Sequence, residues 1–149
     1  MASALYVPVR VAPDRPQVYP TPCRAQVDTG STLTLAGGEL AEDLLADHWS
    51  RYQYFPPPIS IRTADNNSFL AFPIDSAVQV PVYQAAEFIE GAPLFNPFDL
   101  NITIYAGIKQ GGGVIGWDDC DMLIGMDLLS LFRVTIVSGT TQFDPLPMP

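Results

Sequence analysis

The sequence predicts a mainly β domain that carries one or two short helices. Its 15 prolines and 11 glycines, in 149 residues, point to many turns and short strands. Hydrophobic residues make up 48% of the chain and charged residues only 15%, which is typical of a globular protein with a buried core. We therefore expect a single domain over residues 1–149, with its core at about 23–143 between a proline-rich N-terminal segment and a C-terminal tail.

The first third of the chain contains three predicted strands. Residues 4–11 alternate in polarity, and Pro8 predicts an edge strand because proline has no N–H to offer a neighbour. After a stretch interrupted by four prolines, residues 23–28 form the second predicted strand and residues 32–35 the third. Gly30 lies between these two strands and permits a sharp change of direction.

One helix is predicted in the middle of the chain. In residues 39–49, three leucines and His48 recur at helical spacing, and acidic residues gather at the N-terminal end, where the helix dipole favours them. The histidine is expected to pack on its own helix. Residues 52–58 contain three consecutive prolines and are predicted to be an extended connector.

A β-hairpin is predicted next. Residues 59–63 and 69–80 are both β-prone, and the residues between them are rich in Asp and Asn, as hairpin turns are. Residues 81–97 are apolar and rich in proline, and we expect a loop with a short piece of strand there. Residues 99–106 alternate in polarity and predict a further strand.

The C-terminal part is predicted to hold a short strand, a short helix and a hairpin. After a triple-glycine loop, residues 122–124 form a fully apolar strand that ends at Gly125, and residues 127–132 form the helix. Two strands, 133–137 and 140–143, form the closing hairpin, and a proline-rich tail follows.

The charge and the cysteines restrict the possible partners and the compartment. The formal net charge is -9, so a basic surface for nucleic acid or for an anionic membrane is not expected. No apolar run approaches the roughly 20 residues that span a bilayer. We interpret Cys23 and Cys120 as two reduced thiols, because burial as small apolar residues is favoured over a disulfide. Reduced thiols predict a cytoplasmic protein.

Asp28 is the residue whose position most needs an explanation. It ends an apolar strand and is followed at once by Thr29, Gly30 and Ser31. A carboxylate in such a place is expected to be at least half-buried, which costs several kcal/mol unless hydrogen bonds or a shared proton compensate. A surface turn is the simpler alternative, since Asp is common in turns with glycine nearby. We interpret Asp28 as a catalytic carboxylate.

Two segments resemble the signatures of the retropepsin-like aspartic proteases, the single-lobe members of cellular and bacterial type. Val27-Asp28-Thr29-Gly30-Ser31 resembles their active-site loop. Met122-Leu123-Ile124-Gly125-Met126-Asp127-Leu128-Leu129 resembles their second motif, in which two apolar residues and a glycine precede a short helix. A helix and a hairpin lie between the two motifs, in the order that the family shows. The resemblance implies a closed β-barrel and an aspartic endopeptidase that needs no cofactor.

The resemblance also implies that two copies of the chain form one site. Two neighbouring carboxylates that share one proton can activate water and polarise a peptide carbonyl together. The chain has one Asp-Thr-Gly triplet, so the second Asp28 must come from a homodimer. Thr29 would hold the two loops together, Gly30 would allow close approach of substrate, and Ser31 would hydrogen-bond near the carboxylate. The substrate would be an extended, apolar stretch of a peptide or protein.

The hairpin is implied to be a flap that closes over the substrate. Phe69, Leu70 and Phe72 would line apolar pockets beneath it. The substrate-binding tip would be formed by Ala64, Asp65, Asn66, Asn67 and Ser68. The residues with a structural role in the second motif would be Leu123, Ile124, Gly125 and Asp127.

Two alternatives to the protease stay open. Thr32 and Met126 stand where viral members have an aspartate and an arginine that form an ion pair, so the chain is alternatively an inactive member that dimerises or binds peptides. A metal-dependent hydrolase built on Asp118, Asp119 and Asp121 is less favoured, because this spacing fits no metal loop and a solvated acidic loop explains it. No metal is therefore expected.

Overall fold

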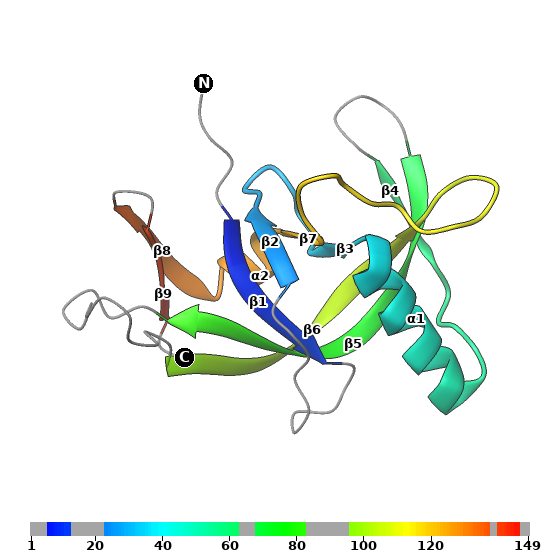
Figure 1. Cartoon of the computed structure of the whole chain (residues 1–149), viewed down its shortest axis with the longest axis horizontal. Coiled ribbons are helices and arrows are strands. Elements are labelled where there is room, and N and C mark those ends of the chain that lie inside the picture. The colour runs from blue at the N-terminus through cyan, green and yellow to red at the C-terminus, as the bar shows by residue number, and fades with distance from the viewer. Residues whose placement is uncertain (1–5, 13–22, 63–67, 83–95, 138–139, 147–149) are drawn as a thin grey trace.

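The structure is a mainly β fold, seen in a computed structural model that describes residues 6–12, 23–62, 68–82, 96–137 and 140–146 (Figure 1). Nine strands and two helices are present in this part of the chain. The strands are β1 (Tyr6–Ala12), β2 (Cys23–Val27), β3 (Leu35–Ala36), β4 (Ile59–Arg62), β5 (Ser68–Val82), β6 (Asn96–Ile108), β7 (Met122–Ile124), β8 (Phe132–Val137) and β9 (Thr140–Pro145). The helices are α1 (Gly38–Tyr52) and α2 (Met126–Leu129).

Six of the strands close into a barrel. Their order is β1-β2-β7-β3-β6-β5, and β1 also pairs with β5, which completes the ring, while β4 extends the sheet from β5. The two halves of β1 pair with different strands: Tyr6 to Val9 pair with β2, and Arg10 to Ala12 pair with β5. The prediction of an edge strand is therefore wrong for β1 as a whole, because its second half joins the other side of the barrel. Pro8 lies in the half that pairs with β2.

The core lies inside this barrel and under the β8–β9 hairpin. Its fully buried side chains are mostly branched aliphatic residues, and Phe143 of β9 is among the largest of them. Phe143 meets Phe132 of β8 edge-to-face with ring centroids 5.6 Å apart, so the hairpin contributes to the core. Helix α1 lies against β5 and β6 on the outside of the barrel (Figure 1).

Three strands form the part of the barrel that carries both sequence motifs. The consecutive strands β2 and β3 do not pair with each other, because β7 lies between them. Strand β7 runs parallel to β2 and antiparallel to β3, with Val27 opposite Ile124 and Leu35 opposite Leu123. The ends of β2 and β7 therefore lie at the same edge, and the residues that follow them, Asp28 and Gly125, start from neighbouring positions.

Most predicted elements occur, with shifted ends. The helix expected at 39–49 extends to Tyr52, and the strand expected at 32–35 is reduced to Leu35–Ala36. That strand is short because the backbone carbonyls of Ser31 and Thr32 accept hydrogen bonds from the start of α2 instead of from a strand. The helix expected at 127–132 ends at Leu129, since Phe132 already belongs to β8.

The hairpin of β4 and β5 is present, with Arg62 opposite Ser68. Its tip, residues 63–67, lies outside the described residues, and so do residues 83–95 of the predicted loop. The ends of that loop, Pro81 and Val82 with Asn96 and Pro97, belong to the paired strands β5 and β6. Within the described part of the chain, neither helix is long and apolar enough to cross a membrane.

Candidate active site

Asp28 is half-buried at the end of β2 and begins a tight turn. Its backbone N–H donates to the carbonyl of Ile124 (3.0 Å), and its own carbonyl accepts from the N–H of Ser31 (3.1 Å). Its carboxylate Oδ1 accepts the N–H of Gly30 (3.0 Å). The backbone of Asp28 is thus fixed on both sides, whereas its carboxylate is engaged at one oxygen by a neighbour in its own turn.

The loop that carries Asp28 (residues 28–34, the Asp28 loop) rests on the segment that contains the second motif (residues 124–128, the α2 segment). The N–H of Met126 donates to Ser31 O (2.8 Å), and the N–H of Asp127 donates to Thr32 O (3.1 Å). Backbone hydrogen bonds do not depend on side-chain identity, so the contact needs the two backbones to be close. The sequence achieves this with Gly125, where an added Cβ would overlap the carbonyl oxygen of Leu33.

Asp127 joins the two segments a second time through its side chain. Its Oδ1 accepts the hydroxyl of Thr34 (2.6 Å) and its Oδ2 accepts the backbone N–H of Thr34 (3.1 Å). The Oδ1 atom also accepts the N–H of Leu128 (2.8 Å), at the start of α2. The hydroxyl of Thr34, which is fully buried, accepts in turn the N–H of Gly125 (3.2 Å). A buried hydroxyl with both a donor and an acceptor as partners is satisfied.

Thr34 was not among the residues predicted from the sequence. It stands 93 positions from Asp127, and no local pattern links the two. Asp127 itself was predicted to have a structural role, and it does connect the motif to the loop. Leu123 and Ile124 supply the pairing of β7 with its two neighbours, and Gly125 supplies the close approach.

The remaining loop residues differ in how they are placed. Thr29 and Gly30 are exposed at the tip of the turn. The hydroxyl of Ser31 donates to the carbonyl of Leu33 (2.7 Å) and so supports the loop backbone, whereas the resemblance implied a hydrogen bond near the Asp28 carboxylate. Thr29 and Gly30 therefore form an exposed tip that another molecule can reach.

The predicted flap is described only at its base. Residues 64–67 (Ala64, Asp65, Asn66 and Asn67) lie outside the described residues, and Ser68 is exposed at the start of β5. Leu70 is exposed to 51%, which suits a residue that meets a ligand. Phe72 instead packs on Phe55 with ring centroids 4.9 Å apart, so it belongs to the contact between β5 and the connector.

The cysteines are not candidate nucleophiles. Both are free thiols, and Cys23 donates to the carbonyl of Val9 (3.0 Å). Burial, together with the nearby Asp121 carboxylate, raises the pKa of Cys23 to about 12. Burial and the carboxylates of Asp119 and Asp121 also raise the pKa of Cys120. Because the thiolate is the reactive form, a raised pKa makes a thiol inert near neutral pH.

The acidic run near Cys120 does not form a cluster of ligands in the described residues, where no group of three or more His, Cys, Asp or Glu side chains is arranged to hold a metal ion. The Asp121 carboxylate accepts the backbone N–H of Arg24 (2.9 Å). His48, predicted to pack on its helix, lies against Tyr52 of that helix in a tilted contact, and it also stacks on Phe55 and meets Tyr54 edge-on.

A scan against models of protein families and a search of curated proteins found no match to this chain.

Proposed function

We propose that the protein is an aspartic endopeptidase of the retropepsin-like type, with Asp28 as its catalytic residue. The observation that carries the proposal is the support of the Asp28 loop. Its backbone is fixed by Ile124, Met126 and Asp127, while the carboxylate makes one hydrogen bond within the described residues, to Gly30. A reactive group on a rigid backbone with its side chain available is what acid–base catalysis requires.

The second carboxylate comes from a second copy of the chain. Asp127 lies close to the same loop, but both of its oxygens accept hydrogen bonds from Thr34 within the chain. Thr29 and Gly30, which are exposed at the tip of the turn, are the residues that meet the other copy. In a two-fold symmetric dimer each copy contributes the same residue, so a single Asp per chain is sufficient for a pair.

The reaction follows from one proton shared by that pair. The ionised carboxylate takes a proton from water as the water oxygen attacks the peptide carbonyl carbon, and the protonated carboxyl donates to the carbonyl oxygen. The tetrahedral intermediate then breaks at the C–N bond. The amine leaves with a proton from the pair, and one hydroxyl of the intermediate returns its proton to the pair. The products are a carboxylic acid and an amine, and the pair again holds one proton. Activity therefore falls on both sides of the pH range in which the pair holds a single proton.

The β4–β5 hairpin fits the role of a flap over an extended, apolar peptide. Its strands pair from Ile59–Ala71 to Arg62–Ser68, and Leu70 presents an exposed apolar side chain near the tip. A hairpin of this kind can bond the backbone of an extended peptide and exclude water from the carboxylates.

The test is cleavage of an unfolded protein by the purified chain. The Asp28→Asn variant keeps the shape of the side chain but cannot act as a base, and we expect about 10³-fold or greater loss of the cleavage rate. The matched control is Asp118→Asn, which removes an exposed carboxylate outside both segments and should cleave like the parent. Equal rates for the parent and Asp28→Asn would exclude Asp28 as the catalytic residue.

A mixing experiment tests the shared site. Excess Asp28→Asn chain added to the parent should inhibit it, because mixed dimers hold only one ionisable Asp28. Inhibition should be absent with a variant that does not dimerise. An active monomer in sedimentation at the assay concentration would contradict the proposal.

The alternative is a module of the same type that binds peptides or dimerises without cleaving them. Two observations favour it: the hydroxyl of Ser31 is used by the loop backbone, and Met126 is exposed to 42% where an ion pair would stabilise a dimer. Peptide binding by the parent that Asp28→Asn retains, with no cleavage by either, would establish this alternative.

A further inference from the structure

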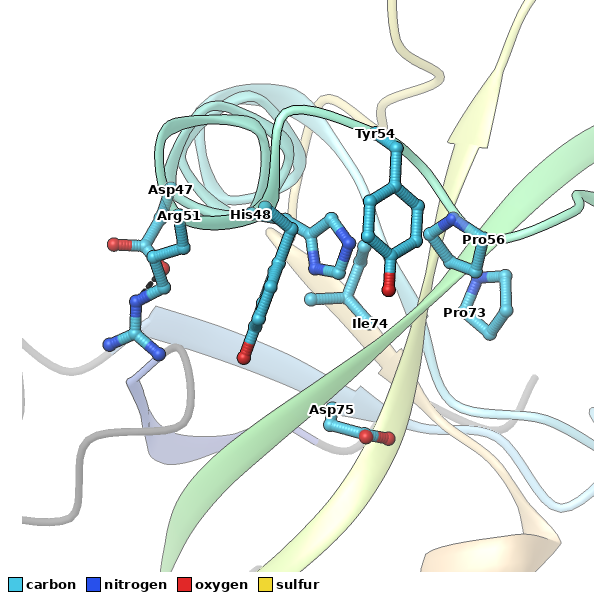
Figure 2. A pocket seen from close by; sticks show the side chains of 9 residues that line it. Asp47, His48, Arg51, Tyr54, Pro56, Pro73, Ile74 and Asp75 are labelled. Atoms are coloured by element: carbon cyan, nitrogen blue, oxygen red, sulfur yellow. Dashed lines mark ion pairs between the residues drawn. The ribbon is translucent and has the colours of Figure 1, made fainter.

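A cavity of about 400 Å³ lies on the outer side of the barrel, between the last turns of α1, the connector after it, and β5 (Figure 2). Small-molecule pockets start at roughly 300 Å³, so this hollow has the size of a ligand site. None of the residues that line it belongs to the Asp28 loop or the α2 segment. The proposed endopeptidase does not use this cavity.

Aromatic rings form much of its wall. The His48 ring lies 4.7 Å from that of Tyr52 and 5.9 Å from that of Tyr54, and the two tyrosine rings are 6.1 Å apart, measured between centroids. Tyr52 is exposed to 46% and Tyr54 to 59%, which is high for rings that contact each other. Figure 2 shows Tyr54 and His48 side by side over Ile74. An exposed tyrosine face carries negative potential and attracts cations.

The charges around the cavity leave a negative balance. The Arg51 Nε lies 3.2 Å from the Asp47 carboxylate, so these two side chains largely balance each other. Asp75 of β5 lies on the other side of the cavity from this pair in Figure 2 and accepts the neutral hydroxyl of Thr103 (3.2 Å). The carboxyl end of α1, which ends at Tyr52, adds the negative end of a helix dipole.

One polar atom in the cavity wall lacks a partner. The Nε2 atom of His48 is shielded from solvent and has no hydrogen-bond partner within the ranges that the structure describes. A buried polar atom without a partner is costly, and an N–H group from a ligand would satisfy it only after the adjoining tyrosine rings move apart.

We propose that this cavity binds a guanidinium or alkylammonium group, with the rings of Tyr52 and Tyr54 as its walls and Asp75 as its counter-ion. A guanidinium suits the site better than an ammonium because its planar face stacks on tyrosine while its N–H groups reach a carboxylate. The group belongs either to a free organic cation or to a basic side chain of a polypeptide.

An NMR titration of the ¹⁵N-labelled chain tests the charge requirement. The probe is N-acetyl-arginine methylamide, and the control ligand is the citrulline analogue, which has nearly the same shape without the charge. We expect saturable shifts at residues 47–56 and 73–75 with the arginine probe, and binding of the citrulline probe that is about 5-fold or more weaker. Equal affinity for the two probes, or shifts spread over the acidic surface, would overturn the proposal.

Variants test the named residues. Asp75→Asn should weaken the arginine probe about 5-fold while it leaves the citrulline probe unchanged, and Tyr54→Leu should weaken the arginine probe by a similar factor. The control Asp99→Asn removes an exposed carboxylate from the neighbouring strand β6, outside the cavity, and should change the affinity less than about 2-fold. The same loss in Asp75→Asn and Asp99→Asn would reduce the effect to overall charge and refute the site.

The source of the cation is distinguished by a third probe, an arginine-containing pentapeptide. Tighter binding of the peptide than of the single residue identifies a polypeptide source, and equal binding identifies a small molecule. Either outcome supports the site, provided that the citrulline forms bind more weakly.

Discussion

Asp28 and Asp127 follow two neighbouring parallel strands, yet their carboxylates are held in different ways. The Asp127 carboxylate accepts three hydrogen bonds, two from Thr34 and one from Leu128. The Asp28 carboxylate accepts one, from Gly30 in its own turn. A charged group bonded on both oxygens stabilises the fold and is not available to a substrate, whereas a half-buried one with a single local bond is available. The difference indicates which aspartate serves the structure and which can serve chemistry.

A substitution that disturbs the close backbone contact at Gly125 should reduce stability the most, because the positions of both aspartates depend on that contact. In Gly125→Ala the new Cβ would lie 2.5 Å from the carbonyl carbon of Leu33, and backbone must move to make room. We expect a loss of about 3 kcal/mol in the free energy of unfolding, measured by urea denaturation. Gly116→Ala is the control, since its Cβ would meet no atom closer than 3.4 Å. Equal losses in the two variants would show that the loop does not rest on Gly125.

Removal of the Asp127 carboxylate should follow in size. Asp127→Ala leaves the buried Thr34 hydroxyl without its acceptor, and we expect a loss of about 2–3 kcal/mol. In a double-mutant cycle with Thr34→Val, the two losses should add to clearly more than the loss in the double variant, since both remove the same bond. Additive losses would mean that the 2.6 Å bond contributes nothing to stability.

Cys23, at the other end of the strand that carries Asp28, offers a third ionisable group for comparison. Its pKa is raised to about 12 in the folded chain, so the unfolded thiol ionises first as the pH rises. The stability that this thiol contributes is complete below the unfolded pKa of about 8.5 and declines as the pH rises toward 12. We expect roughly 1–2 kcal/mol to be lost between pH 7 and 10, and that part of the loss should be absent in Cys23→Ala. The same pH dependence in both chains would place the thiol in contact with solvent.

Asp28→Asn should have the smallest effect on stability. The amide oxygen of Asn can still accept the N–H of Gly30, and no other group within the described residues donates a hydrogen bond to the carboxylate. We expect a change within about 0.5 kcal/mol, measured as for the other variants. A loss similar to that of Asp127→Ala would mean that Asp28 supports the loop and is not available for chemistry.

The sequence predicted the elements well wherever one local pattern decides them. The helix at α1, the strands β2 and β7 and the β8–β9 hairpin follow from periodicity and turn residues. The strand expected at residues 32–35 was placed wrongly, because backbone carbonyls of this stretch accept hydrogen bonds from α2, nearly a hundred positions away. Propensity describes a segment by itself, and this segment's hydrogen bonds are decided by tertiary contacts.

The same limit applies to the sites. The two motifs pointed to Asp28 and Asp127. In each of them an apolar strand is followed within a few residues by a glycine and an acidic residue, and such a pattern can be recognised from a short stretch of sequence. Thr34 carried no such signal, since a threonine in a β-prone stretch is ordinary. The aromatic cavity was missed because residues 52–58 were interpreted only as a connector, and its walls also need Pro73, Ile74 and Asp75 from β5.

The parallel pairing of β2 with β7 also determines when the Asp28 loop can form. Arg24 and Asp121, which are hydrogen-bonded beside this pairing, are 97 positions apart in the chain. Contacts of such long range carry a large loop-closure entropy, which must be overcome before they form. During synthesis, the Asp28 loop has no support until residues 122–128 have emerged. The Asp28 loop therefore depends on a strand pairing that joins two distant parts of the chain.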